Sequence, residues 1–314
     1  MKSDPQTFEA TLSELSRRCR DPREGLFGPR SLSWELGREA FVFLGGGRAA
    51  LLQTAHPFVA HAIDQHSKTK TDPLGRFHRT FEAVYGIVFG DLQQALRMAR
   101  AVHHIHDGIQ GLIREDVGRF RRNDAYMALD AEALLWVHAT LIETVVYVHE
   151  LLRGPMPEWK KDAYYQESKV FARCFGVPAE VLPRDWEAFA NYFDHALHSS
   201  MIAVGDPARE IASFLFSSPR PAARATLRHY ELVTAGLLPP HVREGYGLRF
   251  NLADRAAFHA TIAALRRALP HVPERLRMVP AYVEAKRRIE GRPPVDRAGR
   301  RVEQMLLDFV NPAS

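Results

Sequence analysis

The spacing of apolar residues is the feature that most restricts how this chain can fold. Apolar residues recur at intervals of three and four along almost the whole sequence, whereas the alternation typical of strands is nearly absent. The pattern predicts an all-α fold. Capping residues, glycines and prolines place helices at about 73–89, 91–111, 130–152, 157–175, 183–199, 207–217, 221–235 and 254–269, with an irregular stretch from 237 to 252.

No internal repeat or long linker divides the sequence. We therefore expect one helical domain at 34–280, an N-terminal extension at 1–33 and a helical, basic tail at 281–314. The first residues lack the apolar core of a secretory signal, which favours a cytoplasmic protein. The longest apolar stretch, 131–152, contains the polar residues His138, Glu143, His149 and Glu150. It is predicted to be a buried core helix and not a membrane span.

Charge and cysteine content exclude several classes of function. The net charge is +5, but the densest basic run, 286–301, has no interleaved aromatic residues, so nucleic-acid binding is not expected. The two cysteines, Cys19 and Cys174, form no CxxC or CxxCH motif. This disfavours thiolate zinc sites, iron–sulfur clusters and covalently attached haem, and leaves histidine as the expected metal ligand.

Three consecutive glycines and an arginine, Gly45 to Arg48, lie between two apolar runs. They match neither GxGxxG nor GxxxxGK[ST], and no predicted strand precedes them. A phosphate cradle is therefore disfavoured. We expect close approach of this backbone to a neighbouring helix or to a flat ligand.

The stretch AVHHIHDGIQG at 101–111 contains three histidines. On a helical wheel, His106 lies in line with Val102, Ile109 and Ile113, His103 lies about 60° to one side, and His104 faces away. We therefore expect His106 to point into the core, His103 to lie at its edge and His104 to be partly exposed.

Three chemical interpretations of these histidines remain open. The first is a core histidine that is simply hydrogen-bonded. The second is a zinc site formed by two HxxH pairs, His103 with His106 and His195 with His198; a dinuclear carboxylate site would need ExxH motifs, which the sequence lacks. The third is haem, which needs one axial imidazole, an apolar slot and cationic residues.

A candidate for the opposite wall of such a haem site follows Asp72-Pro73. Arg76, Arg79, Thr80 and Ala83 fall on one face of the helix predicted there. They would combine two guanidinium groups with a hydroxyl. The same spacing is also typical of a solvent-facing arginine stripe.

Five motifs occur in the order and at the spacing of a known family. They are GGGRAALLQTAHPFVAHAIDQHS at 45–67, DPLGRFHRT at 72–80, VFG at 88–90, HHIHDGIQG at 103–111 and WVHATLIET at 136–144. From about Trp34 to about Phe250, the sequence resembles the rubber oxygenase / MpaB-type oxygenase catalytic domain family. That family includes the latex clearing proteins and a fungal isoprenoid-cleaving oxygenase.

The resemblance implies a helical, partly globin-like core that holds a non-covalent haem b. It also implies the use of dioxygen to cleave carbon–carbon double bonds of isoprenoids. By motif position, His106 would be the proximal ligand of the iron, and the distal side would be lined by Arg76, Arg79 and Thr80. Two further family histidines would support the cofactor without ligating it: His103 and His138.

The sequence departs from the latex clearing proteins at two positions. Arg79 replaces a lysine that can approach the iron, and a guanidinium has no lone pair to offer, so we expect a five-coordinate or water-bound resting iron. Those enzymes also use an upstream glutamate as a base, whereas HPFVAHAIDQHS contains none. Asp64 is the substitute we expect, with His61 and His66 as alternatives.

The leading hypothesis is a cytoplasmic haem-b oxygenase that activates O2 to oxidise or cleave a small hydrophobic, isoprenoid-like substrate. Arg79 and Thr80 would polarise bound oxygen, Arg76 would assist them or bind a propionate, and Asp64 would act as the base. A rival from another class is a non-catalytic haem or lipid binding protein on the same fold. A zinc hydrolase is the third hypothesis.

Overall fold

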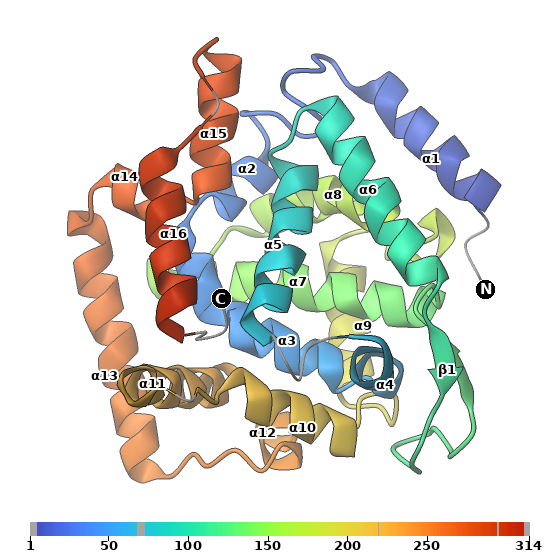
Figure 1. Cartoon of the computed structure of the whole chain (residues 1–314), viewed down its shortest axis with the longest axis vertical. Coiled ribbons are helices and arrows are strands. Elements are labelled where there is room, and N and C mark those ends of the chain that lie inside the picture. The colour runs from blue at the N-terminus through green and yellow to red at the C-terminus, as the bar shows by residue number, and fades with distance from the viewer. Residues whose placement is uncertain (1–4, 68–72, 219, 294, 311–314) are drawn as a thin grey trace.

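The computed structural model describes residues 5–67, 73–218, 220–293 and 295–310, with the side chains of 73–78, 298 and 306–310 left out of the description. It confirms the all-α prediction (Figure 1). The α-helices are α1 (Pro5–Arg18), α2 (Leu32–Gly37), α3 (Gly46–Thr54), α4 (Pro57–His66), α5 (Pro73–Val88), α6 (Leu92–Asp107), α7 (Ala131–Arg153), α8 (Glu158–Cys174), α9 (Trp186–Leu197), α10 (Asp206–Leu215), α11 (Pro221–Leu237), α12 (Pro240–Gly245), α13 (Leu252–Ala268), α14 (Glu274–Arg277), α15 (Pro280–Ile289) and α16 (Arg297–Val310). Three 3-10 helices, η1 (Ala40–Gly45), η3 (Ala179–Val181) and η4 (Leu269–His271), and two strands, β1 (Gln110–Leu112) and β2 (Ala125–Met127), complete the described elements.

Helix α7 runs through the middle of the molecule and organises the core (Figure 1). It begins where predicted, because the Asp130 side chain accepts hydrogen bonds from the backbone N–H groups of Glu132 and Ala133. It ends at Gly154, whose φ of 94° continues no helix. By length and composition α7 is apolar enough to cross a membrane, yet 67% of its most apolar window is buried inside the molecule, as expected of a core helix.

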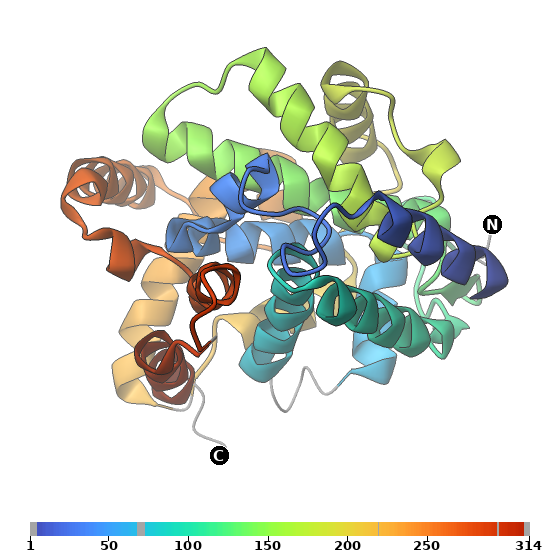
Figure 2. The same cartoon turned by 90° about the horizontal axis from the view of Figure 1, so that it is seen from above.

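Helices α5 and α6 pack against each other (Figure 2). The sequence predicted the start of α5 at residue 73 and the break between the two helices near residue 90. The Asp91 side chain caps α6 by accepting a 2.7 Å hydrogen bond from the Gln94 N–H. The predicted end of α6 near residue 111 is wrong. The helix stops at Asp107, and residues 110–112 form β1 instead.

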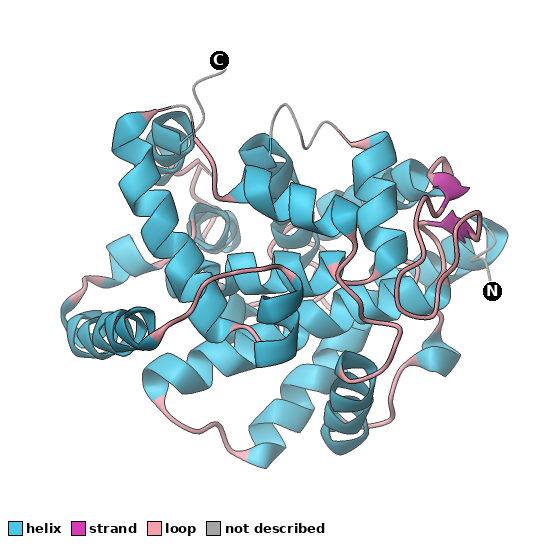
Figure 3. Ribbon diagram, turned by 90° about the horizontal axis from the view of Figure 1, so that it is seen from below, coloured by secondary structure: helices cyan, strands magenta, loops and turns pink. Residues whose placement is uncertain are grey.

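The short hairpin of β1 and β2 lies at one edge of the molecule (Figure 3). Its strands pair antiparallel, with Gly111 opposite Tyr126, and both strands contact α4. Three residues per strand are too few to give the alternation by which sequence analysis detects strands.

Two further details differ from the expected helix boundaries. The stretch 237–252 is not irregular throughout, because Pro240 occupies the first turn of the short helix α12. The cap of α13 is Asn251, and Asp254 is its reciprocal partner in a capping box.

The chain ends cover the central helices. Helix α1 buries Phe8, Leu12 and Leu15, and packs along α8. At the other end α15 lies beside α16, joined by the ion pair of Arg300 with Glu284 at 2.7 Å, and α16 contacts α5. The division at 33 and 280, and a globin-like arrangement of the core, stay predictions.

The glycines at 45–47 confirm the expected close backbone approach, and the neighbours are helices. A Cβ atom on Gly45 would lie 2.4 Å from Thr144 Cγ2 of α7, and one on Gly47 would lie 2.3 Å from Thr234 Oγ1 of α11. The N–H of Gly47 also donates a 2.7 Å hydrogen bond to the Tyr230 hydroxyl. The glycines thus let η1 and α3 pack tightly between α7 and α11.

We expect Gly47→Ala to lower the free energy of unfolding by about 1–3 kcal/mol, because the added methyl group displaces the Thr234 side chain. Urea denaturation measures this loss. Adding Thr234→Ala to the variant should recover part of it, as a coupling between the two sites. Gly108→Ala is the control, since a Cβ there meets nothing closer than 3.7 Å. An equal loss in both glycine variants would contradict the packing explanation.

Candidate functional site

A pocket with a cavity volume of about 90 Å³ lies between α5, α7 and α8, with η1 and α3 closing one side. This volume is below the range of about 300–1,000 Å³ typical of small-molecule sites, so a larger ligand would require the surrounding helices to move apart. Its lining is mainly apolar: Phe27, Ser33, Gly37, Val42, Gly45, Gly46, Ala49, Phe81, Val84, Tyr85, Val88, Leu141, Ile142, Thr144, Val145, Tyr164, Ser168 and Phe171.

Helical periodicity explains why the walls are apolar. On α7, Leu141, Ile142 and Val145 repeat at three and four residues, so one stripe of the helix faces the pocket. On α5 the lining residues 81, 84, 85 and 88 repeat in the same way, and on α8 so do 164, 168 and 171. Three helices therefore each contribute one apolar stripe to one shared space.

The Tyr85 hydroxyl is a polar group in this wall that sequence analysis did not single out. Its oxygen is buried and accepts or donates no hydrogen bond within the described residues. Burial raises the pKa of Tyr85, so the hydroxyl stays protonated at neutral pH and can donate a hydrogen bond. A ligand oxygen would satisfy this donor.

His138 lies on α7, one turn before Leu141 and Ile142, and is buried. Burial lowers its pKa to about 3, so the imidazole is neutral. Its Nε2 lies 3.4 Å from the hydroxyl oxygen of Ser168, and that hydroxyl already donates to the Tyr165 carbonyl at 2.7 Å.

The hydroxyl proton of Ser168 is thus engaged, so Nε2 of His138 must be the donor of the pair and carry the ring proton. The tautomer leaves a lone pair on Nδ1, which is buried and has no hydrogen-bond partner among the residues described. An unsatisfied buried acceptor costs about 1–3 kcal/mol. Because Ser168 also lines the pocket, the His138 ring lies behind the pocket lining, with its protonated Nε2 toward Ser168.

Behind the pocket wall, Arg48 is buried and forms an ion pair with Glu143. Its guanidinium also donates to the Thr144 hydroxyl at 2.6 Å and to the Leu237 carbonyl at 3.0 Å, and lies 4.7 Å from the centre of the Tyr147 ring. Thr144 lines the pocket. Arg48 therefore holds Thr144 of the pocket wall in place. The glycines before it allow η1 and α3 to pack closely against that wall.

The histidines of α6 are ordered differently from the helical-wheel prediction. His103 is the buried residue, stacked on Phe8 with 3.9 Å between ring centres, whereas His106 is half-buried and His104 is exposed. The wheel was wrong because it used Ile109 and Ile113, which lie beyond the end of α6.

The buried face of α6 is instead set by Ala95, Ala99 and His103. His106 lies in the last turn, with its ring centre 6.5 Å from that of Phe175. Phe175 in turn packs on Phe171 of the pocket wall, with 4.7 Å between ring centres. His106 is thus connected to the described pocket through two aromatic rings, Phe175 and the pocket-lining Phe171.

The predicted distal residues belong to α5. Arg79 and Thr80 are exposed and are not among the pocket-lining residues, although Phe81 directly after them is. The backbone of Arg76 lies in the first turns of the same helix, but its side chain is outside the described residues. The pocket-facing stripe of α5 is therefore offset from the RxxRT stripe.

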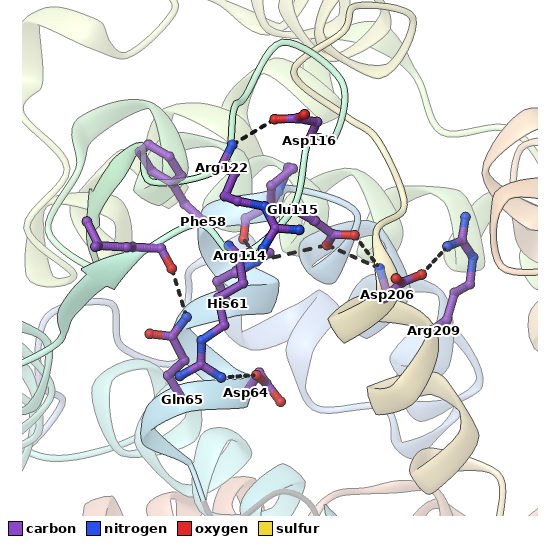
Figure 4. A network of polar contacts seen from close by, with 12 residues as sticks. Phe58, His61, Asp64, Gln65, Arg114, Glu115, Asp116, Arg122, Asp206 and Arg209 are labelled. Atoms are coloured by element: carbon purple, nitrogen blue, oxygen red, sulfur yellow. Dashed lines mark hydrogen bonds and ion pairs between the residues drawn. The ribbon is translucent and has the colours of Figure 1, made fainter.

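Asp64, the expected base, lies in a polar network between α4 and the hairpin (Figure 4). Its carboxylate is 3.7 Å from Nη1 of Arg114 and is not part of the pocket lining. His66 also binds the hairpin, through a 3.0 Å contact of its Nε2 with the Gln110 carbonyl.

His61 is fully engaged in the same network. Its Nδ1 lies 3.1 Å from the Pro57 carbonyl, and its Nε2 accepts a 3.0 Å hydrogen bond from the Arg114 N–H. Burial lowers the pKa of His61, so the 3.9 Å contact with Glu115 joins a neutral ring and not an ion pair. Figure 4 shows Glu115 reaching Asp206, whose N–H it binds at 3.0 Å. These contacts dock the hairpin on α4 and α10.

The two HxxH pairs do not combine. His198 contacts its own helix through Asp194 and lies 5.1 Å from His241, ring centre to ring centre. Across the described part of the chain, no three histidine, cysteine, aspartate or glutamate side chains are grouped as a metal site would require. The zinc hypothesis gains no support here.

The fold and the pocket define an all-α protein with a mainly apolar internal pocket. Residues 34–267 match the family model described as ER-bound oxygenase mpaB/B'/Rubber oxygenase, catalytic domain. The chain belongs to this family, as its five motifs indicated.

Two similar relatives are uncharacterized proteins of Mycobacterium bovis and Mycobacterium tuberculosis. Each is 33% identical over 153 residues, which is 47% of this chain and 59% of the relative. The matched region thus spans little more than half the length of these relatives. No solved structure matches the chain.

Proposed function

We propose that this oxygenase-family domain uses haem b and O2 to oxidise or cleave a carbon–carbon double bond of a small hydrophobic, isoprenoid-like molecule. The observation that carries the proposal is the mainly apolar pocket, with a neutral histidine behind its Ser168, within a chain of this family. Three apolar helix stripes favour an apolar substrate, because they offer few hydrogen bonds to a polar one.

The chemical character of the lining supports a haem group, and the cavity of about 90 Å³ would have to widen to admit it. A flat, mainly apolar cofactor suits walls of aliphatic and aromatic side chains, and the histidines near the pocket supply nitrogen donors without carboxylates competing for the metal. The lone pair on the unsatisfied Nδ1 of His138 would be satisfied by a hydrogen-bond donor of a bound ligand or by a metal ion. Bound haem would supply the iron at which dioxygen is activated.

Two histidines are candidates to hold the group. His106 is supported by its motif position and by the aromatic contact through Phe175 toward the pocket. His138 is supported by burial, neutrality and its place on the pocket-facing stripe. We propose His106 as the iron ligand and His138 as a supporting acceptor in the wall.

The other side chains would have distinct roles. Arg76, Arg79 and Thr80 would supply the cationic and hydroxyl groups of the distal side. The Tyr85 hydroxyl would donate a hydrogen bond inside the pocket and orient a polar atom of the ligand. Asp64 would be the base. Because Arg114 holds its carboxylate beside the hairpin, Asp64 would have to move toward the substrate when the substrate binds.

The proposed function is tested by the visible spectrum of protein purified after haem-sufficient expression, with and without dithionite and carbon monoxide. We expect a Soret band that shifts with carbon monoxide, and O2 consumption with unsaturated terpenoids. A protein without a Soret band would refute the cofactor. Full haem without O2 consumption on any of the substrates would favour the rival, a haem or lipid binding protein.

The pocket itself can be tested with Val145→Phe, which adds a ring to the α7 stripe. We expect about tenfold slower O2 consumption with the best substrate, since crowding a hydrophobic pocket changes binding by about 1–3 kcal/mol. Val302→Phe is the matched control, because Val302 is 55% exposed on α16 and does not line the pocket. Equal rates in both variants would place the substrate elsewhere.

A further inference from the structure

Polar side chains interrupt the apolar lining of the pocket at a few positions: Ser33, Tyr85, Thr144, Tyr164 and Ser168. The three that are not tyrosines are held by the protein itself. Ser33 Oγ donates to the Glu167 carboxylate at 2.9 Å. Ser168 Oγ donates to the Tyr165 carbonyl at 2.7 Å, and Thr144 Oγ1 accepts a 2.6 Å hydrogen bond from Arg48. The two tyrosines of the lining are therefore the candidates for contact with a polar ligand atom.

The two tyrosines reach the pocket from two helices that contact each other, Tyr85 from α5 and Tyr164 from α8. Aromatic neighbours fix the Tyr85 ring, whose centre lies 5.8 Å from that of Phe81 and 5.5 Å from that of Phe89. Its hydroxyl oxygen is buried and has no hydrogen-bond partner among the described residues. A buried hydroxyl in this state is costly, so a bound acceptor would lower the free energy of the site.

Both hydroxyls are protonated at neutral pH and can act as donors. Burial raises the pKa of Tyr85, and the Glu303 carboxylate and an ionised Tyr164 raise it further. Burial also raises the pKa of Tyr164, with a smaller contribution from the Glu167 carboxylate. The influence of Tyr164 on Tyr85 indicates that the two hydroxyls lie within electrostatic range of each other in one lining.

The charges around the tyrosines disfavour an anionic ligand. Within the described part of the chain, the pocket lining contains no charged side chain, so a carboxylate would find no cation there. The charges that act on the two hydroxyls are negative, those of Glu303 and Glu167. Arg48, the cation behind Thr144, already pairs with Glu143. A neutral acceptor is therefore favoured over a carboxylate.

A carbonyl oxygen is the neutral acceptor that matches two donors. It has two lone pairs and no proton, whereas a ligand hydroxyl would also need an acceptor in the wall. We propose that Tyr85 and Tyr164 form a subsite that binds a neutral carbonyl oxygen, so that the pocket takes an apolar ketone or aldehyde. This inference rests on the proposed function in treating the pocket as the substrate site, and it narrows the isoprenoid-like substrate to one that carries a carbonyl group.

Ligand-observed NMR titration of the full chain with cyclohexanone tests the subsite, because a cavity of about 90 Å³ calls for a small probe. Methylenecyclohexane, in which a CH2 group replaces the carbonyl oxygen, and cyclohexanecarboxylate, which carries a charge, are the comparison ligands. We expect cyclohexanone to bind about tenfold more tightly than either, because two hydrogen bonds form with the ketone alone. Equal binding of the ketone and the hydrocarbon, or tighter binding of the carboxylate, would overturn the proposal.

Conservative variants remove each donor and keep the ring. Tyr85→Phe and Tyr164→Phe should each weaken cyclohexanone binding about threefold and leave methylenecyclohexane binding unchanged. Tyr192→Phe is the matched control, because the Tyr192 hydroxyl is also buried without a hydrogen-bond partner among the described residues but does not line the pocket. It should change neither affinity. Equal weakening of both ligands by the two pocket variants would indicate a structural role and contradict the subsite.

The infrared spectrum of bound cyclohexanone reports the hydrogen bonds directly. Donors at a carbonyl oxygen lower its stretching frequency, so we expect a lowered frequency that moves back in each pocket variant and furthest when both tyrosines are replaced. An unshifted frequency in the parent chain would overturn the proposal. The measurement needs neither haem nor O2 consumption. A lowered frequency in a protein without a Soret band would therefore support the subsite and refute the proposed cofactor alone.

Discussion

Protein with His106→Ala is expected to be purified with less than about one tenth of the haem of the parent chain, because the His106 imidazole would supply the coordination bond that holds a b-type haem iron to the protein. The Soret absorbance relative to protein concentration measures the effect. His104→Ala is the matched control, since His104 lies two residues away on the same helix and is exposed. It should retain full haem.

The position of His106 makes this experiment decisive for the site. Phe175 lies between His106 and the described pocket, so ligation by His106 requires the bound group to extend past this ring. Full haem in His106→Ala would refute the assignment and favour His138. In that case His138→Gln, which keeps the residue polar, should lose the Soret band.

Much of the fold could be predicted from the sequence because local signals and tertiary packing agree. Asp91 and Asp130 cap helices as their positions indicate, and Gly154 ends one. The glycines at 45–47 also predicted a close backbone approach, although the residues that they approach, Thr144 and Thr234, could not be predicted from the sequence. Caps and glycines act within a few residues, so their signals survive without knowledge of the fold.

The site was harder to predict because it depends on which helices meet. His103 and His106 differ by one turn, and the neighbours of α6, including Phe8 of α1, decided which of them is buried. No sequence motif predicts that the Tyr85 hydroxyl or the Arg48–Glu143 pair lies at a pocket wall. The sequence signal for the pocket was the apolar stripe of 141, 142 and 145 on α7. Such a stripe predicts which face of a helix is buried, but not which elements pack against that face.

The buried histidines outside the pocket predict a marked loss of stability in acid. Burial lowers the pKa of His56 to about 3 and that of His149 to about 4. Both rings are therefore neutral in the folded chain at pH 5, whereas in the unfolded chain they take up protons below about pH 6.5. The unfolded state then binds more protons, so stability is fully present above pH 6.5 and falls as the pH decreases.

We expect the free energy of unfolding to fall by about 6 kcal/mol between pH 7 and pH 5, about a third of it from each of His56, His149 and the equally buried His138, whose pKa is also lowered to about 3. Urea denaturation at pH 7, 6 and 5 measures the slope. His149→Gln should remove about a third of the pH dependence. Glutamine can still donate to the Leu36 carbonyl, which His149 Nε2 contacts at 3.0 Å, but it does not titrate. His271→Gln, on the exposed side of η4, is the control and should leave the slope unchanged. A neutral buried imidazole at position 149 must make the parent chain more sensitive to pH than His149→Gln. If the two proteins show the same slope, the acid sensitivity arises from other groups.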